Sequence, residues 1–190
     1  MNLRIDDEYL LGLLARLVET PSVFPGERLV MEFLESELAE IGLPSKRIAV
    51  EQGRFNLLSR LGDGHNVLCL NAHSDTVPPI GRSLPEARIE NDVLYGLGSA
   101  DDKASIAAMI AAVRAIREAG IGLNGTLDLL ISVDEECDAR GVRTAIDQGY
   151  RCDMALVGEP TDLQIVPTHC GLVFLDIVAH GRSTHGSMPM

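Results

Sequence analysis

Residues 67–75 read VLCLNAHSD, a compact apolar run that leads directly into His73 and Asp75. The length and composition of this run are those of a buried central strand of a sheet. Residues 126–136 (TLDLLISVDEE) and 154–159 (MALVGE) repeat the arrangement, because each is a mainly apolar run that ends in acidic side chains. Between the first two runs, residues 104–119 carry apolar side chains at helical spacing. Strands that alternate with helices in this way predict an α/β fold.

The rest of the chain supplies further predicted elements, most of them bounded by glycine or proline. Other helices are expected at residues 6–19, 27–41 and 140–148, and other strands at 48–50, 55–61, 163–167 and 172–179. The predicted fold class is therefore α/β, with a mixed, mostly parallel sheet and helices on both faces.

Four segments carry side chains that bind metals: His73-x-Asp75, Asp101-Asp102, Glu135-Glu136 and Glu159. They follow predicted strands or lie in the loops beside them, and functional sites of open α/β sheets gather at the carboxyl ends of strands. Imidazole and carboxylate ligands suit divalent zinc, manganese or cobalt. The Asp of a His-x-Asp pair can also hold the imidazole in one tautomer.

Each segment also has a structural alternative. His73 could be a structural side chain, and Asp101 and Asp102 precede a helix, where acids cap the first turn. Residues 134–136 could form a solvated turn, and Glu159 could be an ordinary loop residue. Three adjacent acids repel one another, however, and a cation would relieve that repulsion. The four segments together favour a metal site over four unrelated structural roles.

Composition excludes several classes of function. The chain has 190 residues, 46% of them hydrophobic, and a formal net charge of −12. An acidic chain without a basic cluster argues against a nucleic-acid partner and against an anionic membrane. The longest apolar run, residues 106–113, is far shorter than the roughly 20 residues that a membrane span needs.

The cysteines and the glycine-rich segments exclude further classes. The four cysteines are widely spaced without a CxxC pair, which fits free thiols in a reducing cytoplasm better than a disulfide framework. The segment from Gly96 to Asp101 has an acid where a dinucleotide-binding loop needs its third glycine. The chain also lacks a Walker loop and the Gly-x-Ser-x-Gly turn of serine hydrolases.

Five motifs in order give the sequence a family resemblance: NAHSDTVP (71–78), LYGLGSADDKAS (94–105), SVDEE (132–136), VGEPT (157–161) and GRSTHGSMP (181–189). Together they resemble the M20 family of dizinc metallopeptidases and amidohydrolases. The resemblance covers nearly the whole chain. It implies two Zn²⁺ ions as cofactors, with Co²⁺ or Mn²⁺ as alternatives.

The resemblance implies a role for each of the metal-binding segments. His73 and Glu159 are expected to bind one metal, Asp101 to bridge both metals, and Glu136 to bind the second metal. Relatives supply a final histidine ligand from a later segment. His169 and His180 do not stand at that position, so the second site of this chain is expected to lack one ligand.

Three residues are expected to act in catalysis by the same resemblance. Glu135 would be the general base, Asp75 would orient His73, and His185 would stabilise the oxyanion in the partner's active site of a homodimer. The expected reaction is hydrolysis of an amide bond in a small N-acyl amino acid, of the deacetylase or desuccinylase type, in the cytoplasm. The alternatives are a di- or tripeptidase or carboxypeptidase of the same family, or a remnant that binds metal without catalysis.

The domain organisation expected from the resemblance has two parts. Residues 1–171 would be the N-terminal part of a dimetal catalytic domain, and residues 172–190 would begin a truncated α+β lid or dimerisation domain. Relatives continue well beyond this point. One edge of the sheet is accordingly expected to lack its neighbouring strand.

Overall fold

The computed structural model describes residues 3–79, 87–171, 173, 175, 177, 178, 180, 181 and 187. The chain divides into two units, Met1–Pro160 and Thr161–Met190. All helices and strands found among the described residues lie in the first unit. The predicted domain boundary after residue 171 stays a prediction.

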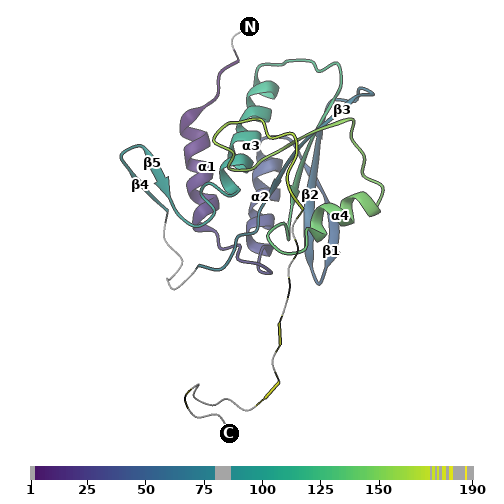
Figure 1. Ribbon diagram of the computed structural model, residues 1–190. Helices are drawn as coiled ribbons and strands as arrows, with labels where there is room; N and C mark the ends of the chain where they lie inside the picture. Colours follow the sequence, from purple (N-terminus) through teal and green to yellow (C-terminus); the bar gives the residue numbers. More distant parts are fainter. Residues whose placement is uncertain are drawn as a thin grey trace. The chain divides into compact units, whose positions relative to one another are not determined.

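The first unit contains four helices and seven strands among its described residues (Figure 1). The helices are α1 (Asp7–Glu19), α2 (Arg28–Glu40), α3 (Lys103–Glu118) and α4 (Arg140–Asp147). The strands are β1 (Ser45–Glu51), β2 (Arg54–Leu61), β3 (Val67–His73), β4 (Arg88–Glu90), β5 (Val93–Tyr95), β6 (Thr126–Ser132) and β7 (Met154–Val157).

The main sheet has the strand order β1-β2-β6-β3-β7. β6, β3 and β7 run parallel to one another, whereas β1 and β2 add on as antiparallel strands. The register pairs His73, the last residue of β3, with Ser132, the last residue of β6. Three neighbouring strands therefore end at one edge of the sheet, as the sequence predicts for a mixed α/β sheet.

Helices cover both faces of the sheet. α1, α2 and α3 pack on one face around the larger core, which includes Leu17, Leu34, Ile110 and Leu129. Ala145 of α4 packs on the other face in a smaller cluster with neighbours from β1, β3 and β6. All seven residues of β6 are buried, because successive side chains enter the two cores in turn. The apolar run at 126–133 thus has the central position that its composition predicts.

A two-stranded hairpin, β4 and β5, was not predicted. Its turn residues Asn91 and Asp92 both have positive φ, of 51° and 62°. These are the conformations of a type I′ turn, which joins short antiparallel strands. The signal was present as an Asn-Asp pair between Ile89 and Val93, but three-residue strands give too short an alternation to stand out.

The strands predicted at 163–167 and 172–179 are wrong for the residues that can be described. Residues 163–167 are in no strand, and Leu163 is fully exposed. The described part of 172–179, which leaves out 172, 174, 176 and 179, also lies outside any strand. An apolar run becomes a strand only when a neighbour accepts its backbone hydrogen bonds. No such neighbour is found among the described residues.

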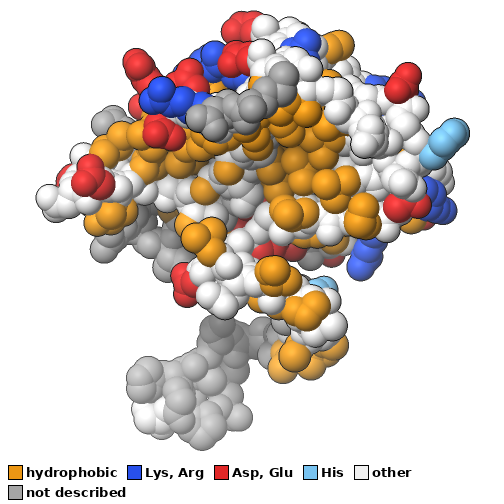
Figure 2. All heavy atoms as spheres, turned by 90° about the horizontal axis from the view of Figure 1, so that it is seen from above, with side chains coloured by type: hydrophobic (Ala, Val, Ile, Leu, Met, Phe, Trp, Pro, Cys, Tyr) orange, Lys and Arg blue, Asp and Glu red, His pale blue; other side chains and the backbone are white. Residues whose placement is uncertain are grey.

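β7 is one of the two edge strands of the main sheet within the described part of the chain, and it pairs only with β3. Met154, Leu156 and Val157 of this strand are each more than half exposed. Figure 2 shows apolar side chains gathered over a broad area of the face that it draws. The helices that the structure describes are too short or too polar to cross a membrane.

Candidate metal centre

The strand ends bring the predicted ligands together. His73 closes β3, Glu135 and Glu136 follow β6, Glu159 follows β7, and Asp101 lies just before α3. The possible ligand atoms form two groups, and within each group all atoms lie within 4.8 Å of one another. One group is His73, Asp101 and Glu136, and the other is His73, Glu135 and Glu159. The histidine is common to both groups, so the site is centred on its ring.

The imidazole of His73 is buried, with only 2% of the residue exposed. Its Nδ1 lies 3.1 Å from the carbonyl oxygen of Asp75 and 3.5 Å from the Oδ1 of that residue. Its Nε2 lies 2.9 Å from Asp101 Oδ1 and 3.9 Å from Glu135 Oε2. A proton on Nδ1 would donate to Asp75, which leaves Nε2 facing the carboxylates as the ligand atom.

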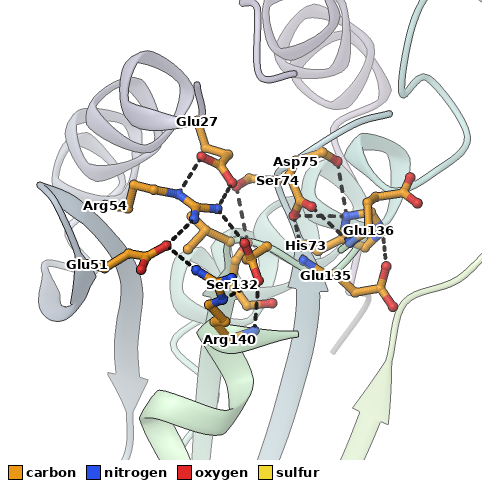
Figure 3. A network of polar contacts seen from close by, with 12 residues as sticks. Glu27, Glu51, Arg54, His73, Ser74, Asp75, Ser132, Glu135, Glu136 and Arg140 are labelled. Carbon is orange, nitrogen blue, oxygen red and sulfur yellow. Dashed lines mark hydrogen bonds and ion pairs between the residues drawn. The ribbon is translucent and has the colours of Figure 1, made fainter. Parts of the chain in front are cut away.

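Asp75 joins the end of β3 to the loop after β6 (Figure 3). Its Oδ1 accepts the N–H of Glu135 at 3.1 Å, and its Oδ2 accepts the N–H of Glu136 at 3.0 Å. Burial by itself would raise the pKa of Asp75, but the contact with His73 and these two N–H donors hold the pKa below its usual value. Asp75 is therefore a buried carboxylate that fixes both the imidazole and the Glu135-Glu136 backbone.

The charges around His73 change its protonation. Burial by itself would lower the pKa of the imidazole, but the hydrogen bond and charge of Asp75 and the charges of Asp102 and Glu135 raise it to about 10. Without a cation, His73 therefore carries a proton that the surrounding carboxylates stabilise. A metal ion at Nε2 would take the place of that proton.

Carboxyl groups of the site also have shifted pKa values, because they lie close to one another. Burial, followed by the charges of Glu135, Asp101 and Asp102, raises the pKa of Glu159 to about 7 despite the opposing effect of His73. Burial and then Asp101 also raise the pKa of Glu136. Crowded carboxylates that hold protons near neutral pH are stabilised by a divalent cation. The donor set of one imidazole and several carboxylates thus fits a metal of the zinc type.

Two buried residues beside the site, Asp102 and Lys103, have no role in the assignment that the family resemblance implies. Asp102 stands at the N-cap of α3 but makes no capping hydrogen bond, so the capping alternative is wrong for it. Its Oδ2 instead accepts the N–H of His73 at 3.2 Å, and its Oδ1 has no hydrogen-bond partner among the residues that the structure describes. Lys103 is buried as well, and its Nζ donates to the carbonyl oxygen of Thr20 at 3.0 Å. The only sequence signal for Asp102 and Lys103 is that they are charged residues at the start of an apolar helix.

His185 lies outside the described residues, so the role expected for it stays a prediction. The remaining predicted site residues, Asp75 included, meet around the ring of His73. The two groups of donors differ from the expected assignment, because His73 rather than Asp101 is common to both groups and Glu135 lies with His73 and Glu159.

The sequence of this chain matches a known family model. The model of peptidase family M20/M25/M40 matches residues 69–184. The chain belongs to this family. The match begins in β3 and includes all of the residues gathered around His73, so it covers the same segments as the candidate metal centre. The resemblance expected from the five motifs is confirmed.

M20 relatives with different described activities are similar to this chain. A probable succinyl-diaminopimelate desuccinylase of Staphylococcus epidermidis is 28% identical over 97% of this chain and 47% of its own length. An acetylornithine deacetylase of Pasteurella multocida is 36% identical over 89% of this chain and 46% of its own length. The chain spans about half the length of the curated relatives it matches.

Solved M20 structures share the fold. A tripeptidase from Staphylococcus aureus aligns with a TM-score of 0.70 at 25% identity, over 80% of this chain and 43% of its own. An M20 family metallo-carboxypeptidase from Sulfolobus solfataricus aligns with a TM-score of 0.70 at 21% identity, over 78% of this chain and 37% of its own. The second likeness concerns the fold alone. Together these structures confirm the mixed α/β architecture.

Proposed function

We propose that this chain forms the metal-binding part of a hydrolase that cleaves the amide bond of a small N-acyl amino acid. The observation that carries the proposal is the convergence of acidic residues from three loops on the buried ring of His73. The proposed ligands are His73, Asp101, Glu136 and Glu159. Two Zn²⁺ ions are the proposed cofactors, and Co²⁺ or Mn²⁺ suit the same donors.

The metal and Glu135 have separate parts in the proposed reaction. Divalent cations at this site would supply Lewis acidity toward the amide carbonyl and the attacking water. Glu135 is the proposed general base, and its carboxylate, at 44% exposure, is open to solvent and to a substrate. It would accept a proton from the water at a carboxylate oxygen and later deliver that proton to the leaving amine.

The other proposed roles concern positioning and charge. Asp75 would hold His73 with Nε2 directed at the metal, because its carbonyl oxygen and its carboxylate Oδ1 lie 3.1 Å and 3.5 Å from Nδ1. His185 would donate to the oxyanion in the partner's active site of a homodimer. Residues 1–171 are the proposed N-terminal part of the catalytic domain, residues 172–190 the proposed start of a lid, and the cytoplasm the proposed location.

A dipeptidase or tripeptidase activity is the second candidate. It is supported by the likeness to the tripeptidase from Staphylococcus aureus. A ranking of substrates by kcat/KM would separate the two candidates, with N-acetyl and N-succinyl amino acids in one set and di- and tripeptides in the other. Faster turnover of the acylated set supports the first candidate, and faster turnover of the peptides supports the second.

The variant Glu135→Gln tests the hydrolase proposal. It keeps the size of the side chain but cannot accept a proton, so kcat should fall by about 10²–10⁴-fold while zinc affinity changes little. The assay uses this chain and the same chain extended along its gene, both loaded with zinc. Retained turnover in the variant would contradict the role of Glu135. Tight zinc binding without turnover of either substrate set by the extended wild-type chain would favour a non-catalytic remnant.

A further inference from the structure

The loop that carries Glu135 and Glu136 is held from two sides. On one side the carboxylate of Asp75 accepts both of their backbone N–H groups. On the other side lies Asp134, which is fully buried and follows β6 in a left-handed conformation with φ of 69°. This conformation is uncommon for residues other than glycine, and in an aspartate it is stabilised by hydrogen bonds to the short polar side chain.

The contacts of Asp134 show what holds it. Its Oδ2 accepts the N–H of Arg140, the first residue of α4, at 3.0 Å, and its carbonyl oxygen accepts the N–H of Ala139 at 2.7 Å. Its Oδ1 accepts a hydrogen bond from the guanidinium Nη2 of Arg54 at 3.0 Å. The first two contacts close the turn, whereas the third anchors it to another part of the fold.

Arg54 is the first residue of β2, far from this turn in the sequence, and its side chain is only 7% exposed. The guanidinium also donates two hydrogen bonds to the fully buried Glu27. Its Nε lies 2.9 Å from Glu27 Oε2, and its Nη2 donates to Glu27 Oε1. Nη1 lies 3.2 Å from Glu51, which in turn accepts a hydrogen bond from Arg140 at 2.7 Å (Figure 3). The planar guanidinium thus joins two buried carboxylates, a geometry that a lysine ammonium cannot reproduce.

We propose that Arg54 is a positioning residue for Glu135 and Glu136, and that it acts through the carboxylate of Asp134. The inference rests on the proposed function, because Glu136 is a proposed ligand and Glu135 the proposed base. Arg54 would touch neither metal nor substrate. Glu27 accepts hydrogen bonds from Nε and Nη2 of the guanidinium and so fixes its position. The same Nη2 also donates to Asp134 and so holds the backbone that presents the two glutamates.

The first test is hydrogen exchange in the metal-free chain. The variant Arg54→Lys keeps the charge but loses the planar fork, so the amides of Glu135 and Glu136 should exchange about tenfold faster or more. The matched control is Arg60→Lys on the same strand. Arg60 also donates bidentate hydrogen bonds to a buried carboxylate, that of Asp128, at 2.7 and 2.8 Å. Asp128 takes no part in the turn that contains Asp134. The control should leave these two amides unchanged.

The second test is zinc affinity by calorimetry on the same proteins. We expect about 10–100-fold weaker binding for Arg54→Lys and wild-type binding for Arg60→Lys. Asp134→Asn should weaken binding similarly, and adding Arg54→Lys to it should cost little more, because both changes break one connection. Asp134→Asn also serves as the primary variant if Arg54→Lys fails to fold.

The outcomes separate this inference from the proposed function. If both arginine variants lose thermal stability alike, and Arg54→Lys keeps wild-type exchange and zinc affinity, Arg54 is only a structural ion-pair partner and the inference is overturned. If the wild-type chain binds no zinc, the proposed function fails. The exchange rates of Glu135 and Glu136 would then still decide whether Arg54 positions the loop.

Discussion

The carboxylate of Asp75 holds the backbone of Glu136, since its Oδ2 accepts the Glu136 N–H at 3.0 Å. The other oxygen of the same carboxylate accepts the N–H of Glu135. The residue that orients the imidazole therefore also sets the position of the loop that bears the proposed base and a proposed ligand. Metal affinity and the geometry of the β6 loop are accordingly coupled through one buried side chain.

This coupling predicts the effect of Asp75→Asn. An amide has one acceptor oxygen, so one of the two backbone N–H groups loses its partner and the free energy of unfolding should fall by about 1–3 kcal/mol. Zinc affinity should fall by about 10–100-fold because His73 loses its orienting carboxylate. Chemical denaturation and calorimetry measure the two effects. Asp63→Asn, on an exposed loop, is the control and should change neither. Wild-type zinc affinity in Asp75→Asn would contradict the coupling.

The shifted pKa values predict how the metal-free chain responds to pH. The folded state raises the pKa of His73 from 6.5 to about 10 and that of Glu159 from 4.5 to about 7. Both groups therefore hold protons more tightly in the folded chain. The stability that these protons add is lost as the pH rises from 4.5 to about 7 for Glu159 and from 6.5 to about 10 for His73. Asp75 works in the opposite sense, but its lowered pKa acts only below its ordinary value of 3.8.

Thermal melts of the metal-free chain measure this dependence. The Tm should fall as the pH rises from 5.5 to 8, and saturating zinc at pH 8 should reverse the loss because the cation replaces the protons. Glu159→Gln should flatten the profile, whereas Glu40→Gln at the exposed end of α2 should leave it unchanged. A Tm that rises over this range without metal would show that the carboxylates do not repel one another as described.

Gly158 allows β7 to approach α3 closely. A Cβ at this position would lie 2.4 Å from the Cβ of Ser105, which is closer than two carbon atoms can pack. Gly158→Ala should therefore displace Glu159, lower the free energy of unfolding by about 1–3 kcal/mol and weaken zinc binding. Gly12→Ala in α1 is the control. It has open space for a Cβ and should stabilise the chain by about 0.5–1 kcal/mol. Unchanged zinc binding in Gly158→Ala would show that the contact does not position Glu159.

Much of the fold was predictable from local patterns. The bounds of α1, α2, α3 and α4 agree with the sequence prediction to within one residue, because an apolar stripe and a glycine or proline stop are local signals. The β4–β5 hairpin was missed because its strands are three residues long. The strand predicted at 163–167 is wrong because the apolar run there has no neighbouring strand to pair with among the described residues.

The candidate site was predictable to a different extent. His73, Glu136 and Glu159 could be placed together because the ends of parallel strands meet at one edge of a sheet. The contact of Arg54 with Asp134 spans 80 residues, and nothing local in the sequence tells which acid an arginine will pair with. Asp134 was visible as one of three adjacent acids. Its burial, and its use as an anchor rather than as a ligand, depend on packing that only the structure shows.

The most direct test of the metal centre is zinc binding by the metal-free chain, measured by calorimetry with His73→Ala and His169→Ala as paired variants. His73 is the buried centre of both donor groups, whereas His169 is exposed and belongs to neither. We predict at least one zinc equivalent in the wild-type chain, no specific binding in His73→Ala, and wild-type binding in His169→Ala. Equal binding by the wild-type chain and His73→Ala, or no binding by the wild-type chain, would contradict a metal centre at these strand ends.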